Sequence, residues 1–203
     1  MDAIAGAVQG GLRMNIKPIL FNTEMVKALL SGIKTCTRRK IPIDIVDFCD
    51  IDHDGELLSY QNSYGDFINP EKLCRYQSGD ILYVRETWCK GSYGNEKEKY
   101  YYKADDNNFF CTWHPSIHMP KEAARIWLKV TNVRVERLQD IDIDGIRNEG
   151  LSSTAVHVGD MSIALKEWAL LWNSIVKKSD IDTYGWDANP YVWVIEFERC
   201  EKQ

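Results

Sequence analysis

The segment at residues 126–138 contains the clearest strand in the sequence, and it strongly limits the fold classes open to the chain. Its apolar side chains alternate with polar ones, as expected for a strand with one buried face. The alternation slips by one position near Thr131 and Asn132, which indicates a β-bulge. Further strands are predicted at residues 17–21, 81–87, 100–103 and 191–197.

Short amphipathic helices are predicted between these strands, without a regular strand-helix repeat. They lie at residues 24–31, at residues 163–176 and in a short stretch that ends at Glu149. Thr23 is expected to cap the first helix, and Asp140 or Asp142 the short one. Such irregular alternation is typical of an α+β fold built on a small, closed sheet. The glycine patterns of phosphate-binding and dinucleotide-binding loops are absent.

Length and composition predict one domain with a substantial core. The 203 residues are 44% hydrophobic, which suits a single domain over residues 14–200. Polar, turn-rich stretches at residues 41–79 and 91–117 are interpreted as insertions, and residues 1–13 as a disordered extension. The net charge of −5 argues against sequence-independent binding of a long duplex, which needs many phosphate contacts.

The cysteines and the hydropathy pattern bear on location. Six scattered cysteines form no Cys-x-x-Cys pair, and in a chain of this size without a secretory signal they predict reduced thiols in the cytoplasm. No apolar run approaches the ~20 residues that span a bilayer, so no membrane partner is expected.

A basic cluster runs against this acidic background. Lys34, Arg38, Arg39 and Lys40 place four cations directly after Gly32. Thr35 and Thr37 add two hydroxyl groups within the same stretch. Cations and hydroxyls gathered after a helix end can hold an anion or activate a polar substrate. A solvated basic turn is the alternative interpretation.

The chain resembles a known family in several stretches. Gly-x-Lys-Thr-x-Thr-Arg-Arg at residues 32–39 and Gly-Asp-x-Leu-x-Val-Arg-Glu-Thr-Trp at residues 79–88 are similar to motifs of the ASCH domain, a member of the PUA-like superfamily. Residues 115–120, 133–141 and 186–197 resemble phage and prophage versions of that domain. The resemblance covers residues 14–199, nearly the whole chain.

This resemblance implies a PUA-like small mixed β-barrel with flanking helices and a basic cleft that faces RNA or a modified nucleoside. Binding of such a ligand is therefore the leading functional hypothesis. Some relatives hydrolyse the acyl amide of N4-acetylcytidine, and others are associated with ribonuclease activity, so both remain alternatives. A phage product would act in the cytoplasm of a bacterial host, where a host protein is a further candidate partner.

The hydrolase alternative names three catalytic residues by resemblance. Thr37 would attack the amide carbonyl, Lys34 would take its proton, and Glu149 would protonate the leaving nitrogen. The role of Lys34 as a base requires that its amine be substantially desolvated. Lys34 and Thr37 are otherwise expected to contact a phosphate or cap a helix end. Glu149 is otherwise an exposed residue or a partner of Arg147.

Other residues are candidates for ligand contacts. Thr35, Arg38 and Arg39 belong to the basic cluster, while Arg85, Trp88 and His118 are candidates from elsewhere in the chain. Trp88 is suited to stack on a base, although a place in the core explains it equally well. Trp168 and Trp172, four residues apart on one helix face, are predicted core residues.

One pattern raises the question of a metal site. Cys111, His114 and His118 have a spacing that zinc ligands use, but a fourth ligand is not evident. Pro115 would break a helix that aligned the two histidines. A structural turn is therefore expected here, with no metal and no cofactor.

Overall fold

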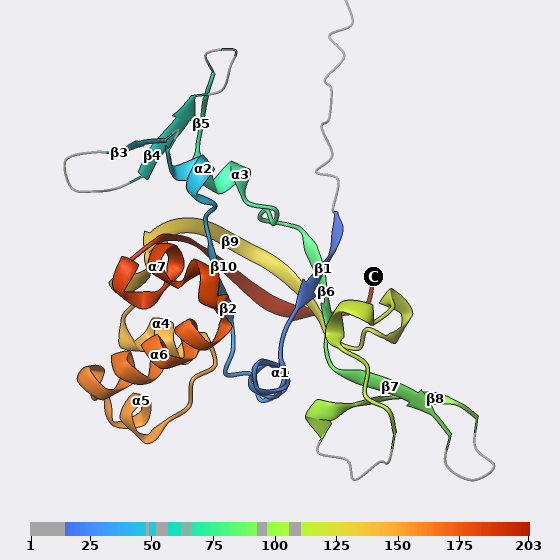
Figure 1. Cartoon of the computed structure of the whole chain (residues 1–203). Coiled ribbons are helices and arrows are strands. Elements are labelled where there is room, and N and C mark those ends of the chain that lie inside the picture. The colour runs from blue at the N-terminus through green and yellow to red at the C-terminus, as the bar shows by residue number, and fades with distance from the viewer. Residues whose placement is uncertain are drawn as a thin grey trace, which may run out of the picture.

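The computed structural model describes residues 15–203 except 48, 52–56, 62–63, 65, 93–96 and 106–110. The extension predicted at residues 1–13 lies outside the described residues. The central sheet has the order β1 (Ile16–Leu20), β6 (Ile81–Arg85), β9 (Trp127–Arg137), β10 (Tyr191–Cys200) and β2 (Cys36–Lys40). β1 and β6 are parallel, and the other neighbours are antiparallel. Figure 1 shows β9 and β10 curving across the middle of the molecule.

The predicted bulge is confirmed on β9. Glu196 of β10 pairs with Asn132, whereas the next residue, Phe197, pairs with Val130, so Thr131 is left out of the register. An extra residue bends its strand and increases its twist. The two longest strands can therefore curve together around the elements that they enclose.

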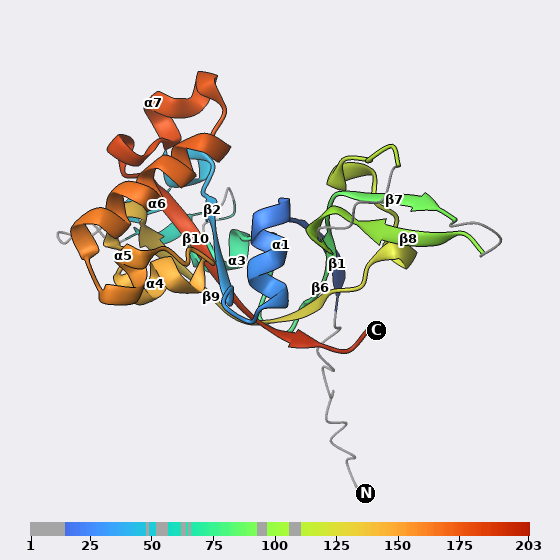
Figure 2. The same cartoon turned by 90° about the horizontal axis from the view of Figure 1, so that it is seen from below.

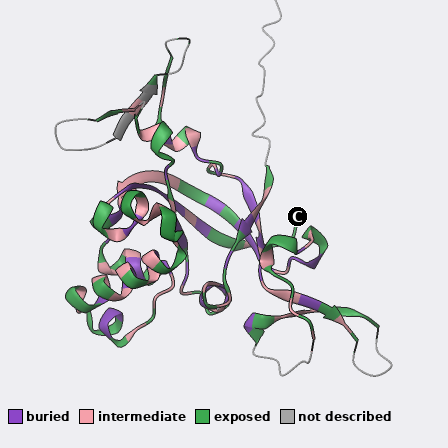
Figure 3. Ribbon diagram, in the orientation of Figure 1, coloured by how far each residue is buried: buried purple, intermediate pink, exposed green. Residues whose placement is uncertain are grey.

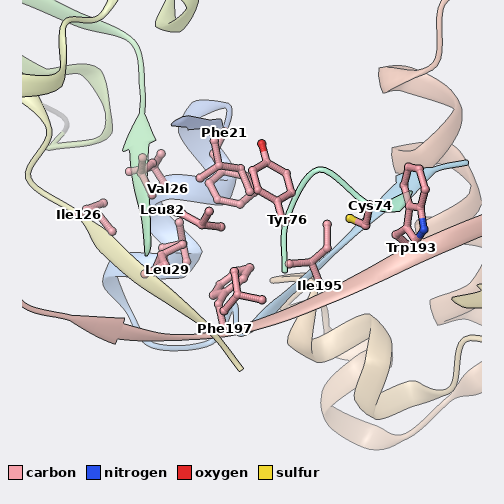
Figure 4. Close-up of a cluster of buried hydrophobic side chains, with 14 of the residues drawn as sticks. Phe21, Val26, Leu29, Cys74, Tyr76, Leu82, Ile126, Trp193, Ile195 and Phe197 are labelled. Carbon is pink, nitrogen blue, oxygen red and sulfur yellow. The ribbon is translucent and has the colours of Figure 1, made fainter. Parts of the chain in front are cut away.

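Alternate residues of β10 enter two separate cores. Trp193, Ile195 and Phe197 lie in the core that α1 (Thr23–Leu30) covers, which Figure 4 shows. Val192 and Val194 enter the other core, with the helices on the opposite side of the sheet. This division follows from the two-residue period of a strand that is buried on both faces. Figure 3 shows the buried residues concentrated along these central strands.

The second core is covered by helices close to the C-terminal strand. They are α4 (Ile143–Asn148), α5 (Thr154–Val158), α6 (Met161–Ile175) and α7 (Ile181–Tyr184). Figure 2 shows this group on one side of β2, with α1 on the other. Trp168 and Trp172 are 2% and 3% exposed, which confirms their prediction as core residues.

The two predicted insertions carry structure of their own. Residues 41–79 hold α2 (Ile43–Asp47), α3 (Pro70–Leu73) and a three-stranded sheet of β3 (Cys49–Ile51), β4 (Leu57–Gln61) and β5 (Phe67–Ile68). This sheet projects from the body in Figure 1. Within residues 91–117, β8 (Lys99–Tyr102) pairs with β7 (Trp88–Gly91), most of which precedes the predicted insertion, as an antiparallel ribbon.

The α+β class with flanking helices is confirmed, but several local expectations need correction. The sheet does not close into a barrel, because its edges β1 and β2 do not pair with each other within the described residues. The alternative interpretation of the basic cluster as a solvated turn is wrong for residues 36–40, because these residues form strand β2. The first helix is capped by Asn22, whose side chain accepts a hydrogen bond from Met25 N, and Thr23 is its first helical residue.

The cysteine prediction is wrong for two of the six residues. Cys89 of β7 and Cys111 are joined by a disulfide, while Cys36, Cys49, Cys74 and Cys200 are free. The bridge ties the segment that leads to His114 onto the β7–β8 ribbon, where Trp88 and His114 also pair through their backbones. A separation of 22 residues gives no sequence signal for this pairing.

Candidate functional site

The turn after α1 directs Lys34 into the protein. The helix ends at Leu30 with Ser31 as its C-cap, and Gly32 follows with a φ of 76°, which is accessible to glycine without a steric penalty. The backbone amide of Lys34 then donates to Ala28 O, and that of Thr35 donates to Asn148 O, which fixes the entry into β2. The side chain of Lys34 is consequently fully buried, at 0% exposure. The desolvation that the hydrolase hypothesis requires is present.

Three hydrogen bonds hold the Lys34 ammonium group. Its Nζ donates to Cys36 O at 2.8 Å, to Glu149 O at 2.7 Å and to Glu149 Oε2 at 2.8 Å. An ammonium group has three donors, so every one of them is used. The ring of Phe21 adds a cation–π contact, with its centroid 5.3 Å from Nζ.

Both carboxylate oxygens of Glu149 accept hydrogen bonds, Oε2 from Lys34 and Oε1 from Arg38. Glu149 is the C-terminal cap of α4, and its Oε1 accepts from Arg38 N at 2.6 Å and lies 3.4 Å from Arg38 Nη1. The following residue, Gly150, has a φ of 99°, and a Cβ there would lie 2.7 Å from Ala28 Cβ. Only glycine allows this close approach to α1, so Gly150 brings Glu149 within reach of Lys34.

Arg38 extends the ionic contacts beyond Glu149. Its Nη2 donates to Glu136 Oε2 of β9 at 2.9 Å, and Glu136 also pairs with Arg134, which contacts Glu196 of β10. Charges of opposite sign therefore alternate across three strands. The Nε of Arg38 is buried and has no hydrogen-bond partner anywhere in the described part of the chain.

Thr37 is near the Lys34–Glu149 pair in sequence, but its side chain lies on the opposite face of β2 from that of Arg38. It pairs with Ile195, whereas Arg38 pairs with Val194, and these two β10 residues belong to different cores. Thr37 is 2% exposed, and within the described residues its hydroxyl makes no hydrogen bond with Lys34 or Glu149. The structure thus joins two of the three predicted catalytic residues directly.

The remaining members of the basic cluster lie along the same strand. Arg39 is half-buried, donates to Leu20 O at 3.1 Å and places its guanidinium 5.6 Å from the Phe21 ring. Burial lowers the pKa of Arg39 from its ordinary value of 12.5, although an arginine remains charged near neutral pH. Lys40 is paired with Asp180 at 2.9 Å, and Thr35 is exposed.

The other three predicted contact residues form a separate group. Arg85 donates to Ile117 O, and His118 ends an exposed turn of 3-10 helix in the same segment. The Trp88 ring packs against Tyr100 and His114, with centroids 5.7 and 5.1 Å away. These side chains contact the segment at residues 111–119 instead of the Lys34–Glu149 pair. Trp88 belongs in part to a small core, the alternative that the sequence left open.

The zinc pattern does not form a metal site. Cys111 is engaged in the disulfide with Cys89. Among the described residues, no group of three His, Cys, Asp or Glu side chains is placed to hold a metal ion.

No helix in the described ranges has both the length and the apolar character that a bilayer span needs.

One cavity is lined by Arg38, the partner of Glu149, and another is lined by Glu149 itself. The first, here called the basic groove, has a volume of about 220 Å³ and is lined by Arg38, Arg39, Lys40, Trp172, Ile175, Val176 and Lys177. The second, here called the α1 cavity, has a volume of about 450 Å³. Its walls are the start of α1, the segment at residues 149–153 and Leu171.

Sequence reasoning missed some residues of the site. Lys177 reaches the basic groove from just beyond α6, far from the cluster at residues 34–40 in sequence. Glu136 lies within residues 133–141, which resemble phage versions of the ASCH domain, but nothing local in the sequence marks it as a partner of Arg38. Only the fold could bring these residues together.

Comparisons with known proteins support no assignment by sequence, because no family model and no curated protein matches the chain. Similar solved structures include an ASCH domain from Lactobacillus crispatus, with a TM-score of 0.40 and 10% identity over 91% of this chain and 79% of that one. A DUF984 protein from Enterococcus faecalis, EF3133, has a TM-score of 0.41 and 13% identity over 94% and 78% of the two chains. The hypothetical protein PH0355 has a TM-score of 0.41 and 14% identity over 92% of this chain and 100% of that one. TM-scores of this size leave the function to be inferred from the residues of the site.

Proposed function

We propose that this chain binds RNA or a modified nucleotide, with an anionic part of the ligand in the basic groove. Support comes from the charges that line the groove. Arg39 and Lys177 form no ion pair in the part of the chain that the structure describes, so neither cation is in direct contact with a carboxylate, although the charges of Glu149 and Asp180 act on them from further away. Cationic side chains beside an apolar wall of Trp172 and Val176 suit a ligand that joins a phosphate to a less polar group.

The observation that carries this proposal is the unpartnered Nε of Arg38. This donor is buried in a side chain that is only 2% exposed, and the same side chain lines the basic groove. A buried donor without a partner is destabilising by about 1–3 kcal/mol, and more when the group is charged. This Nε has almost no accessible surface, so a phosphate oxygen in the groove would provide the missing acceptor once the Arg38 side chain turns toward the ligand.

Titration at low salt tests the proposal. Short single-stranded RNAs and nucleotides are added to the protein, and binding is followed by calorimetry. We expect binding that weakens as salt rises, because phosphate contacts release counterions. The double variant with Arg39→Gln and Lys177→Gln should bind more weakly by about tenfold or more. Lys129→Gln removes an exposed cation elsewhere on the sheet and is the matched control.

Two results would refute binding in this groove. One is the absence of any binding at low salt. The other is an unchanged affinity of the double variant, relative to both wild type and Lys129→Gln. Circular dichroism of each variant verifies that the fold is retained, so that weak binding is not caused by unfolding.

A second candidate function is hydrolysis of an acylated base, and the Lys34–Glu149 contact favours it. Both side chains are buried, and Glu149 also lines the α1 cavity, which is large enough to admit a nucleoside. In this reaction Thr37 Oγ1 would form a bond to the acyl carbon, and the C–N bond would break as the amine gained a proton. Water would then release the acyl group from Thr37.

The geometry sets a condition for this activity. Lys34 uses all three ammonium protons, so it must pass one of them on before it can accept the proton of Thr37. Incubation with N4-acetylcytidine, followed by chromatography, gives a direct test. Release of cytidine by wild type but not by Thr37→Val would support the activity. No release by wild type would eliminate it, whereas equal release by Thr37→Val would exclude Thr37 as the nucleophile.

A further inference from the structure

The basic groove and the α1 cavity are adjacent. Arg38 lines the groove and Glu149 lines the cavity, and these two residues are in direct contact through the 2.6 Å bond from Arg38 N to Glu149 Oε1. Leu171 and Trp172 are consecutive residues of α6. Leu171 lines the α1 cavity, and Trp172 lines the basic groove. The two cavities are therefore lined by residues that are neighbours in the structure.

The two cavities differ in their chemistry. Four cationic side chains line the groove, whereas none of the described residues that line the α1 cavity is a lysine or an arginine. The cavity instead has the carboxylate of Glu24 and the hydroxyls of Ser152 and Ser153, while the carboxylate of Glu149 is already engaged by Lys34 and Arg38. Carboxylates repel a phosphate, but they accept hydrogen bonds from the amino and hydroxyl groups of a nucleoside.

The remaining polar groups of the cavity wall keep some capacity for a ligand. The Ser153 hydroxyl accepts from Val156 N and Asn22 Oδ1 accepts from Met25 N, so each side chain retains its own donors. Leu151 and Leu171 supply apolar surface beside these groups. A flat ring that carries both donors and acceptors, such as a nucleobase, matches this combination.

Size also favours a ligand divided between the two cavities. Small-molecule sites usually have volumes of about 300–1,000 Å³. The α1 cavity, at about 450 Å³, lies in that range, and the groove, at about 220 Å³, lies below it. The groove is thus better suited to a phosphate with part of a sugar than to a whole nucleotide.

We infer that the two cavities together hold one nucleotide, with its phosphate in the basic groove and its nucleoside in the α1 cavity. The inference rests on the proposed function and goes further, since it assigns one nucleotide to one site in place of a long RNA track. The nucleotide can come free in solution or from the end of an RNA strand.

Calorimetry with three probes and two variants tests the division. The probes are inorganic phosphate, cytidine and cytidine monophosphate. Ser152→Trp places a large side chain in the α1 cavity, and Ser162→Trp is the matched control on the exposed start of α6. Lys177→Gln removes a cation from the groove. Circular dichroism verifies the fold of each variant.

We expect cytidine monophosphate to bind at least about tenfold more tightly than cytidine or phosphate alone. Ser152→Trp should weaken cytidine and cytidine monophosphate but leave phosphate unchanged. Lys177→Gln should weaken phosphate and cytidine monophosphate but leave cytidine unchanged. If Ser152→Trp leaves cytidine monophosphate unchanged while Lys177→Gln weakens it, the divided site is refuted and binding in the groove stands. If wild type binds no probe and no RNA, both proposals fail.

Oligonucleotides of different length distinguish a free nucleotide from the end of an RNA strand as the ligand. A strand-end site predicts that a terminally phosphorylated dinucleotide and octanucleotide bind equally tightly, with a salt dependence of roughly −0.7 per phosphate held. A free-nucleotide site predicts that only the mononucleotide binds. Affinity and salt dependence that both increase with strand length would overturn the one-nucleotide inference, although RNA binding itself would be upheld.

Discussion

Lys34 Nζ lies 2.8 Å from Glu149 Oε2, and 115 residues separate the two in sequence. Both side chains are almost completely buried, at 0% and 2% exposure. Buried charges are costly to desolvate, and good geometry with further hydrogen bonds is needed to offset that cost. Arg38 and the backbone of Cys36 supply those bonds. The contact therefore fixes the end of α4 against the start of β2.

Replacement of Glu149 should destabilise the protein strongly. Glu149→Ala leaves the charges of Lys34 and Arg38 buried without their carboxylate, and the expected loss of unfolding free energy is about 3–5 kcal/mol. Urea denaturation measures it. Glu198→Ala is the control, because Glu198 is 61% exposed and only 4.0 Å from Lys129, and it should cost less than about 1 kcal/mol. Equal losses for the two variants would show that the buried pair is not structurally important.

Two glycine substitutions separate backbone strain from crowding. Gly150 and Gly159 have positive φ angles of 99° and 75°, but only at Gly150 would a Cβ meet another atom within 4 Å. Gly159→Ala should cost about 1–2 kcal/mol from its backbone conformation. Gly150→Ala should cost an additional 1–3 kcal/mol or so from contact with Ala28. Thermal unfolding of both variants tests whether Gly150→Ala is the more destabilising one. Equal losses of stability would contradict the close approach of Gly150 to Ala28.

The thiol of Cys36 predicts a loss of stability at alkaline pH. Burial, with a smaller contribution from the charge of Glu149, raises the pKa of Cys36 from 9.0 to about 12. Above pH 9 the unfolded thiol loses its proton while the folded thiol keeps it, so its contribution to stability falls as pH rises between those values.

A comparison with Cys36→Ala measures this effect. The stability of wild type relative to the variant should fall by about 1.4 kcal/mol for each pH unit in that window and stay constant below it. Urea denaturation at a series of pH values gives the difference. A difference that does not change with pH would mean that Cys36 is accessible to water.

The disulfide should make stability sensitive to reductant. A bridge between Cys89 and Cys111 closes a loop of 22 residues, and its reduction should lower the unfolding free energy by about 3 kcal/mol. Cys111→Ala should have this lower stability under both conditions. Mass spectrometry of the unreduced protein after proteolysis should find the linked peptides. Equal stability of wild type with and without reductant would argue against the bridge.

The sequence predicted those elements whose signal is local. The β-bulge on β9 and the amphipathic helix α6 are both present in the structure. Each was predictable because its sequence pattern depends only on neighbouring residues. β2 was not predicted, since its sequence Cys36–Lys40 is polar and has weak strand propensity. It forms a strand because β10 pairs with it and because Glu149 and Glu136 neutralise Arg38.

The site was foreseen in part through family resemblance. The resemblance predicts Lys34 and Glu149 as members of one catalytic site, and the structure brings them into contact. Their catalytic roles stay predictions. An ASCH domain is among the similar structures, and the phage type stays a prediction as well. Lys177 and the Cys89–Cys111 pair depend on contacts between segments far apart in sequence, and such contacts leave no periodic pattern.

The order of strands has a consequence for how the chain is made. β10 sits between β9 and β2, so β2 has no neighbour in the sheet until residues 191–200 have left the ribosome. During synthesis β2 therefore stays without a strand partner until the much later segment of β10 has been made. Loss of residues 191–200 would therefore remove the strand that joins β2 to β9 and leave β2 without a partner in the sheet.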